Sequence, residues 1–239
     1  MYNAAMSNKT NKYGMTRKQE KAAGKLFGKY VTREKALVLA VMTTLVCLMP
    51  ILTGLRLWDK IPEIVRTGLI GKNGADDSMP RGVLVFGIPG LMAVLNCICH
   101  GQLYLNQKAQ KLAPQASRIV GRWGFPVLSS VFASGCAFSA AGEKLTAGYV
   151  LPCLLALTLL LLGSHFFDCK RESKIAFHFT YMEYSAELWR KTHRLAGVGW
   201  MTAGLIVLFC ICYLGTVPLW TAPVLALLLF APFPIGKRI

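Results

Sequence analysis

The side chains best suited to chemistry in the apolar part of this sequence are a few cysteines and histidines. Cys97, Cys99 and His100 end one apolar run, and His165 and Cys169 end another. Thiolate and imidazole groups bind zinc and copper, which makes a metal site one hypothesis. The usual Cys-x-x-Cys spacing is missing, however, and cysteine is a common small apolar residue in helices. We therefore expect no metal and no cofactor.

Catalytic groups are scarce in the same runs. None of the runs contains Asp, Glu, Lys or Arg, the residues that normally mark functional positions inside a membrane. One run carries four serines without a basic partner nearby, and small residues of this kind more often let helices approach closely. Phosphate-binding glycine loops and zinc-protease motifs are absent too, so we expect no enzyme. The serines are Ser129, Ser130, Ser134 and Ser139.

The composition is that of a membrane protein. Of the 239 residues, 54% are hydrophobic and only 16% are charged, whereas soluble domains carry about 25% charged residues. Four uncharged windows match the roughly 20 residues that one helical span needs. A fifth, of 42 residues, contains a turn-forming stretch from Gly215 to Pro218 and so predicts two helices. The windows are Ala36 to Leu55, Gly82 to Gln107, Trp123 to Gly142, Leu145 to Phe167 and Leu195 to Gly236.

The predicted fold class is therefore an all-α, polytopic membrane protein with six transmembrane helices. If the N-terminus is inside, the cytoplasmic segments hold 21 of the 27 Lys and Arg residues. These segments then carry about +15 of the net charge of +16, and the outer segments about +1. We predict that both termini lie in the cytoplasm. The basic excess indicates anionic lipids of the inner leaflet as partners and no nucleic acid.

None of the cysteines of the sequence lies in the outer segments, so no disulfide is expected.

The predicted topology divides the chain into five parts. The N-terminal part has the pattern of an amphipathic interfacial helix in its second half, and disorder is the alternative for its first 14 residues. The parts are a basic cytoplasmic tail (1–35), two spans with an outer loop at 56–81 (36–107), the third and fourth spans (108–167), a basic cytoplasmic loop (168–194), and a helical hairpin with a short tail (195–239).

The outer loop is the only sizeable outward surface. It combines Trp58 and Asp59 with a corner at Ile61 and Pro62, where the proline should end any helix continuing from the first span. Residues 71–78 are rich in Gly, Asn and Asp and predict a flexible turn. We predict that the first four of these residues form a binding site for an external ligand.

The inner loop ends in a basic, aromatic segment. Ser185 is a candidate helix N-cap, and Trp189 follows it within a helical pattern. We predict that this segment lies along the membrane interface, where it anchors the bundle or signals to a cytoplasmic partner. A plain basic connector between two spans is the alternative. The residues concerned are Trp189, Arg190, Lys191, His193 and Arg194.

These two loops resemble parts of the SdpI family of bacterial membrane proteins, whose named function is immunity to a secreted, membrane-active peptide toxin. The stretch from Trp58 to Pro62 is similar to the family's N-terminal Pro-x-x-Ile-Pro element, with Trp58 in place of the first proline, and Arg81 and the span proline Pro89 follow it. The stretch from Trp189 to Arg194 is similar to the family's C-terminal signature before the fifth span.

The chain also departs from the family pattern. The family's Arg and Pro before the signature Trp are missing between Ala176 and Tyr181, and Ile64 stands where many relatives carry His. The resemblance covers residues 40–235 and implies an immunity protein of the bacterial inner membrane that meets a peptide toxin on its outer face. The alternative is a membrane subunit of a small-molecule or peptide transporter that works with an ATPase, although no midplane acid or inverted repeat supports coupled transport.

Overall fold

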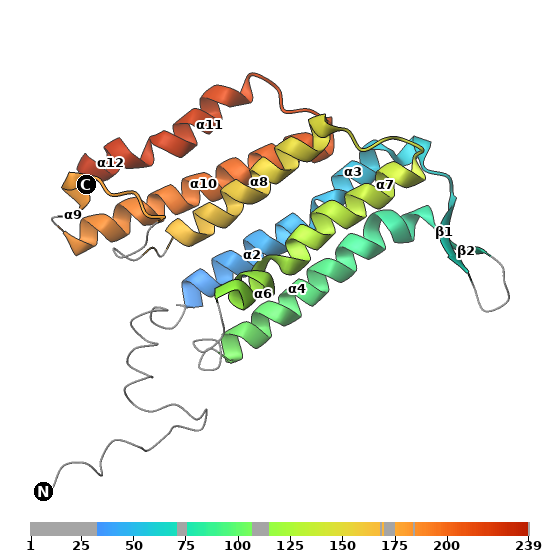
Figure 1. Cartoon of the computed structure of the whole chain (residues 1–239), viewed down its shortest axis with the longest axis horizontal. Helices are drawn as coiled ribbons and strands as arrows, with labels where there is room; N and C mark the ends of the chain where they lie inside the picture. Colours follow the sequence, from blue (N-terminus) through green and yellow to red (C-terminus); the bar gives the residue numbers. More distant parts are fainter. Residues whose placement is uncertain are drawn as a thin grey trace, which may run out of the picture.

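The computed structural model describes residues 33–70, 76–106, 115–167, 169, 175–183 and 185–238, which form a bundle of long helices (Figure 1). Most of the basic tail predicted for 1–35 lies outside these residues. Within them, five helical segments are long and apolar enough to cross a membrane, so the chain is a multi-pass membrane protein. The segments are Lys35–Arg56, Val83–Leu105, Ile119–Ala140, Ala147–Phe166 and Ala186–Leu214.

The first three spans each depart from a regular α-helix, the second at its start and the other two further along. Proline lacks the backbone N–H that a helix needs, and Pro50 accordingly divides the first span at Met49. The other two contain π-helical turns, which place one extra residue in a turn and often occur at functional positions. The elements are α2 (Arg33–Leu48), α3 (Pro50–Arg56), the π-helix η2 (Val83–Gly87), α4 (Ile88–Leu105), α6 (Gln115–Leu128), the π-helix η3 (Ser129–Ala133) and α7 (Ser134–Ala140).

The C-terminal helices pack beside these spans. The predicted turn at Gly215 is confirmed, because this residue ends α10 with a positive φ of 77°, a conformation that glycine adopts without steric cost. The sixth predicted span is shorter than expected, since its apolar stretch covers only Thr221–Ile235 and is interrupted before Pro232. The elements are α8 (Ala147–Phe166), α9 (Thr180–Glu183), α10 (Ala186–Leu214), α11 (Thr221–Phe230) and α12 (Pro232–Arg238).

The described part of the chain is nearly all-α, as predicted, with one exception: the outer loop contains a β-hairpin. Strand β1 (Ile64–Ile70) pairs antiparallel with β2 (Asp76–Pro80), and a register shift separates their two ends. A flexible turn was predicted for 71–78, but β2 already begins at Asp76. The β-branched residues Ile64, Val65 and Thr67 are a strand signal in the sequence.

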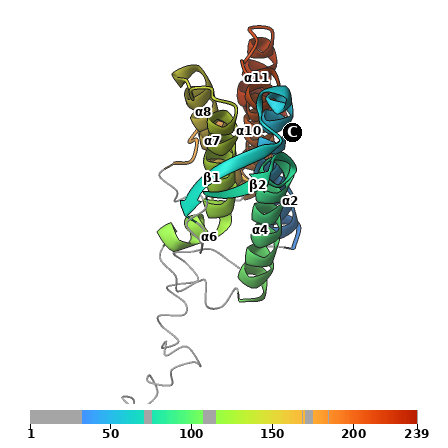
Figure 2. The same cartoon turned by 90° about the vertical axis from the view of Figure 1, so that its right-hand side faces the viewer.

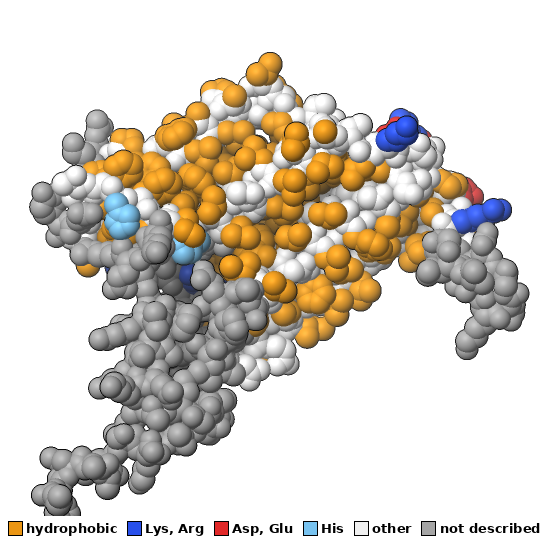
Figure 3. Space-filling model, viewed as in Figure 1, with side chains coloured by type: hydrophobic (Ala, Val, Ile, Leu, Met, Phe, Trp, Pro, Cys, Tyr) orange, Lys and Arg blue, Asp and Glu red, His pale blue; other side chains and the backbone are white. Residues whose placement is uncertain are grey.

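The hairpin defines one end of the bundle, here called the hairpin end. It projects beyond α3 and α7 in Figure 1 and lies in front of the helices in Figure 2, and the other end, with α9 and α12, is the opposite end. The view in Figure 3 shows apolar side chains along the middle of the helices, with the described Lys, Arg, Asp and Glu side chains gathered near the ends. This distribution matches an apolar membrane interior between two polar boundaries.

Helices α8 and α10 are in close backbone contact. A Cβ added at Gly163 would lie 2.7 Å from the backbone N of Met201, and one added at Gly197 would lie 2.6 Å from that of Phe167. Without a strong hydrophobic force between helices in lipid, such close contact is a main source of attraction. The small residues of α10 therefore decide how tightly the C-terminal half of the bundle packs.

Candidate functional site

The outer site is built around Trp58, which begins the short 3₁₀-helix Trp58–Lys60. Its half-buried ring lies between two partners from the start of the second span. The Arg81 guanidinium carbon is 4.3 Å from the ring centroid, and the Phe86 ring is 5.9 Å away. An arginine over a tryptophan face forms a cation–π contact. The structure therefore joins the end of the first span to the start of the second at this ring.

The other predicted ligand-binding residues divide by exposure. Asp59 and Pro62 are exposed and stand beside Trp58 at the hairpin end. Ile61 is only 2% exposed and belongs to the hydrophobic core, so its role is to hold the corner in place. The prediction that Ile61 contacts a ligand is therefore corrected, because a side chain buried among its neighbours offers no surface to an external molecule.

Two polar contacts hold the outer site in place. The backbone N–H of Arg81 donates to the Glu63 carbonyl at 2.9 Å, which closes the base of the hairpin. Lys60 forms an exposed ion pair with Glu143 from the loop between α7 and α8. The sequence-based site did not include Arg81. The signal for it was its position as the charged residue directly before the second apolar window.

The structure places the inner segment differently from what the sequence predicted. Residues 186–194 are the first turns of α10 and not the end of a loop, because Ser185 caps the helix there. Trp189 is only 4% exposed, and its indole N–H donates to the Cys169 carbonyl at 2.9 Å. The sequence placed this segment along the membrane interface, but the Trp189 ring is turned into the bundle and ties α10 to the end of α8.

Trp189 also contacts His193, one helical turn further along α10. The two rings stack with centroids 4.0 Å apart, and His193 Nδ1 lies 3.0 Å from the Trp189 carbonyl. A carbonyl only accepts, so Nδ1 carries the proton and donates. The cations beside these rings are exposed: Arg190 projects outward, and Lys191 pairs with Glu187 one turn earlier at 3.1 Å. Arg194 lies 5.1 Å from the Phe167 ring centroid.

The N-cap that starts α10 gives the first prediction. The Ser185 hydroxyl accepts from the backbone N–H groups of Glu187 at 3.2 Å and Leu188 at 3.4 Å. Replacing such a cap by alanine typically costs about 1 kcal/mol. Ser185→Ala should lower the free energy of unfolding by that amount in an SDS titration followed by circular dichroism, and Ser185→Asp should retain it. Equal loss in both variants would contradict the capping role.

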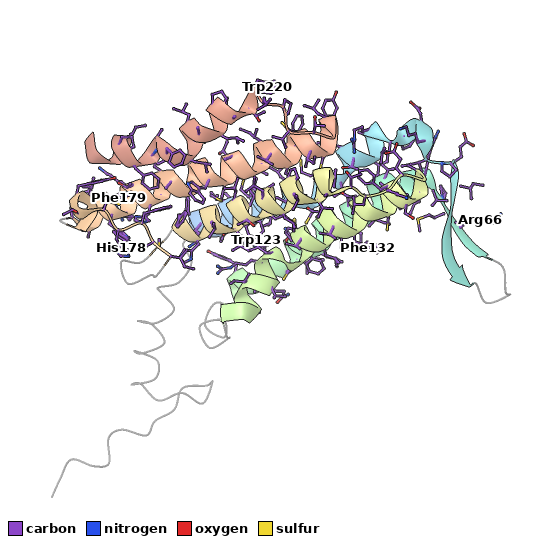
Figure 4. The ribbon with its side chains drawn as sticks, turned by 45° about the horizontal axis from the view of Figure 1, so that its top comes forward. Arg66, Trp123, Phe132, His178, Phe179 and Trp220 are labelled. Carbon is purple, nitrogen blue, oxygen red and sulfur yellow. The ribbon has the colours of Figure 1, made fainter. Side chains whose placement is uncertain are left out.

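An aromatic cluster at the opposite end was not predicted. The Phe177 ring lies 4.9 Å from Phe166 of α8, 5.7 Å from Trp200 of α10 and 4.7 Å from Phe233 of α12. The Tyr181 hydroxyl donates to the Phe233 carbonyl at 2.7 Å, and burial raises its pKa, so it stays protonated. Figure 4 shows His178 and Phe179 at this end, far from Arg66 on the hairpin. The density of aromatics at 177–181 was the available signal.

Polar side chains also meet inside the spans. Asn96 of α4 is fully buried and donates to Thr43 at 3.0 Å and to Thr44 at 3.1 Å, both on α2. Deeper toward the hairpin end, the Tyr149 hydroxyl lies 2.9 Å from that of Thr53 and donates to Ser134 at 3.0 Å. Hydrogen bonds of this kind fix the register of neighbouring helices in lipid.

The residues considered as metal ligands contact other groups. Cys97 lies 3.4 Å from the Thr44 hydroxyl, Cys99 donates to the Gly121 carbonyl at 3.0 Å, and His100 lies 3.0 Å from the Thr43 hydroxyl. His165 and Cys169 contact each other at 3.6 Å. Among the described residues, no group of three or more His, Cys, Asp or Glu side chains is arranged to hold a metal ion.

Comparison with known proteins gives one result for the C-terminal part of the chain. Residues 183–236 match the SdpI/YfhL protein family. The match starts just before the Ser185 cap and includes the Trp189 segment, α10 and α11. No curated protein and no solved structure matches the chain. Over this segment, the chain is similar to the SdpI/YfhL protein family.

Proposed function

We propose that this chain is a bacterial inner-membrane immunity protein that protects its cell against a membrane-active peptide toxin, without catalysing a reaction. The observation that carries the proposal is the match of residues 183–236 to the SdpI/YfhL family. The multi-pass architecture suits a protein that meets such a peptide at the membrane surface.

The proposal includes an orientation in which the hairpin end faces outward. In Figure 1 the described chain begins and ends on the side away from the hairpin, as an even number of crossings requires. The sixth crossing would be made by α11 and α12 together, because α11 alone, at about 15 Å, is shorter than a hydrocarbon core of about 30 Å. Both termini then lie in the cytoplasm, as the distribution of basic residues favours.

In this orientation the outer site is the toxin-contacting surface. Trp58 and Arg81 form a rigid aromatic and cationic pair, the kind of pair that often dominates binding energy at an interface. Asp59 and Pro62 extend this surface toward solvent. At the cytoplasmic end, the exposed Arg190 and Lys191 would contact anionic lipid or a cytoplasmic partner, while the buried Trp189 would hold α10 in place.

The test is resistance in a toxin-sensitive bacterium. Expression of the chain should raise the minimal inhibitory concentration of at least one purified peptide toxin from a panel of membrane-active ones. The double variant Trp58→Ala/Arg81→Ala should lose most of that protection, because truncating a central contact of about 2 kcal/mol lowers affinity about thirtyfold. Protein abundance in the membrane, measured by immunoblot, should stay unchanged.

The matched control is Lys144→Gln, which removes an exposed charge at the same end without touching Trp58. This variant should protect as well as the unaltered chain. Unchanged sensitivity to every toxin of the panel would refute the proposal. A stable ATPase that co-purifies with the chain would instead support a transport subunit.

A further inference from the structure

A groove on the lipid-facing side of the bundle lies outside the toxin-contacting surface. It runs between α10 and α11 beside the end of α2, and its volume of about 540 Å³ falls within the range of about 300–1,000 Å³ seen for small-molecule pockets. Met49, Phe209, Trp220 and Val224 contribute to its walls, which are mostly hydrocarbon and aromatic. Trp220, labelled in Figure 4, is 65% exposed beside it.

The length of the groove matches one leaflet of a membrane. Along α10 it extends from Thr202 to Leu214, which at a rise of 1.5 Å per residue is about 18 Å. Half of a hydrocarbon core of about 30 Å is about 15 Å. Because Leu214 is the last residue of α10, the groove begins at the hairpin end and stops near the middle of the bundle. An occupant of this length is a single hydrocarbon chain.

A cationic side chain, that of Arg56, lies at the hairpin end of this groove. The Arg56 side chain lies against Gly215, so that a Cβ added there would collide with Nη1, and Gly215 directly follows the groove residue Leu214. Met49, another wall residue, precedes Arg56 by two helical turns. In the part of the chain that the structure describes, Arg56 contacts the Phe138 ring at 5.6 Å and takes part in no ion pair.

We propose that this groove binds one acyl chain of an anionic phospholipid from the leaflet at the hairpin end, with its phosphate held by Arg56. A guanidinium presents a planar fork of donors that matches a phosphate group. The order of one cation followed by a leaflet-long apolar groove corresponds to the order of head group and tail in such a lipid. This inference is independent of toxin immunity, because it uses neither Trp58 nor Arg81.

The experiment is native mass spectrometry of the full chain in detergent, with dioleoyl-phosphatidylglycerol or dioleoyl-phosphatidylcholine added at equal concentrations. One phosphatidylglycerol should remain bound at collision energies that remove phosphatidylcholine. Arg56→Gln should lower the occupancy by phosphatidylglycerol about tenfold, the loss expected for a charge-assisted hydrogen bond. Thr202→Trp fills the inner end of the groove and should lower the occupancy by both lipids.

Arg66→Gln is the matched control, since Arg66 is an exposed arginine on the hairpin and the charge change is the same. It should leave lipid retention unchanged. Equal retention of the two lipids, or equal loss in Arg56→Gln and Arg66→Gln, would overturn the proposal. A dimer that Thr202→Trp dissociates would show instead that the groove is an interface between two copies. If Arg56→Gln fails to fold, retention in Thr202→Trp decides the question.

Discussion

The Gly197→Leu variant is expected to lose the folded bundle, whereas Gly101→Leu is expected to keep it. A side chain at Gly197 would meet backbone atoms, namely Phe167 N at 2.6 Å and the Gly163 carbonyl oxygen at 2.8 Å. Side chains yield by rotation, but backbone atoms move only if the helices separate. Overpacking a core costs about 1–3 kcal/mol and more where the obstacle is rigid, so the contact between α8 and α10 should open.

The measurement is size-exclusion chromatography of the purified protein in mild detergent, together with its thermal transition. Gly197→Leu should elute as aggregate or give no cooperative transition. Gly101 is exposed on α4 with no atom within 4 Å of its added Cβ, so a leucine there should leave both readouts unchanged. A folded Gly197→Leu protein with an unaltered transition would show that the two helices are not in close backbone contact.

The second large effect is expected at Trp189, whose truncation to alanine should lower the free energy of unfolding by about 3–5 kcal/mol. The variant removes a buried ring that stacks on His193 and lies 5.2 Å from the His178 ring. It also leaves the Cys169 carbonyl without the N–H that now donates to it. Trp189→Phe keeps most of the ring packing and loses only the donor, so its cost should be about 1 kcal/mol.

Circular dichroism during an SDS titration measures the free energy of unfolding of both variants without relying on tryptophan fluorescence. The difference between the two free energies separates the contribution of ring packing from that of the hydrogen bond. If the ring instead lay at the lipid interface, as the sequence led us to expect, Trp189→Ala would change the unfolding free energy by little more than Trp189→Phe does. A small, equal effect of the two substitutions would therefore restore the interfacial interpretation.

Local signals in the sequence were sufficient for the helices and their ends. The uncharged windows located five membrane-crossing segments, because each charge inside a bilayer is costly and leaves a clear gap in the pattern. Ser185 and Gly215 were recognised as the start and the end of helical segments, because capping depends on one residue and its immediate neighbours. The hairpin was missed although its strand pattern was present, since residues 71–78 of the outer loop were interpreted as a flexible turn.

The candidate site depended on contacts that are distant in sequence. Trp58 and Asp59 were identified, but the partner of Trp58 is Arg81, on the far side of the hairpin. Ile61 has the same residue type whether it faces solvent or the core, and only the packing around it decided that it is buried. The groove at Trp220 likewise arises from how α11 leaves α10 after the turn.

The sequence by itself determined that this is a multi-pass membrane protein, where its apolar segments lie and how the longest helix begins and ends. Only the tertiary structure decided which faces of those helices meet each other, with Trp189 turned inward and Arg56 set at the end of a groove. The physical reason is that lipid is as apolar as a protein core. A helix surrounded by lipid needs no polar face, so its sequence does not show which side packs against a neighbour.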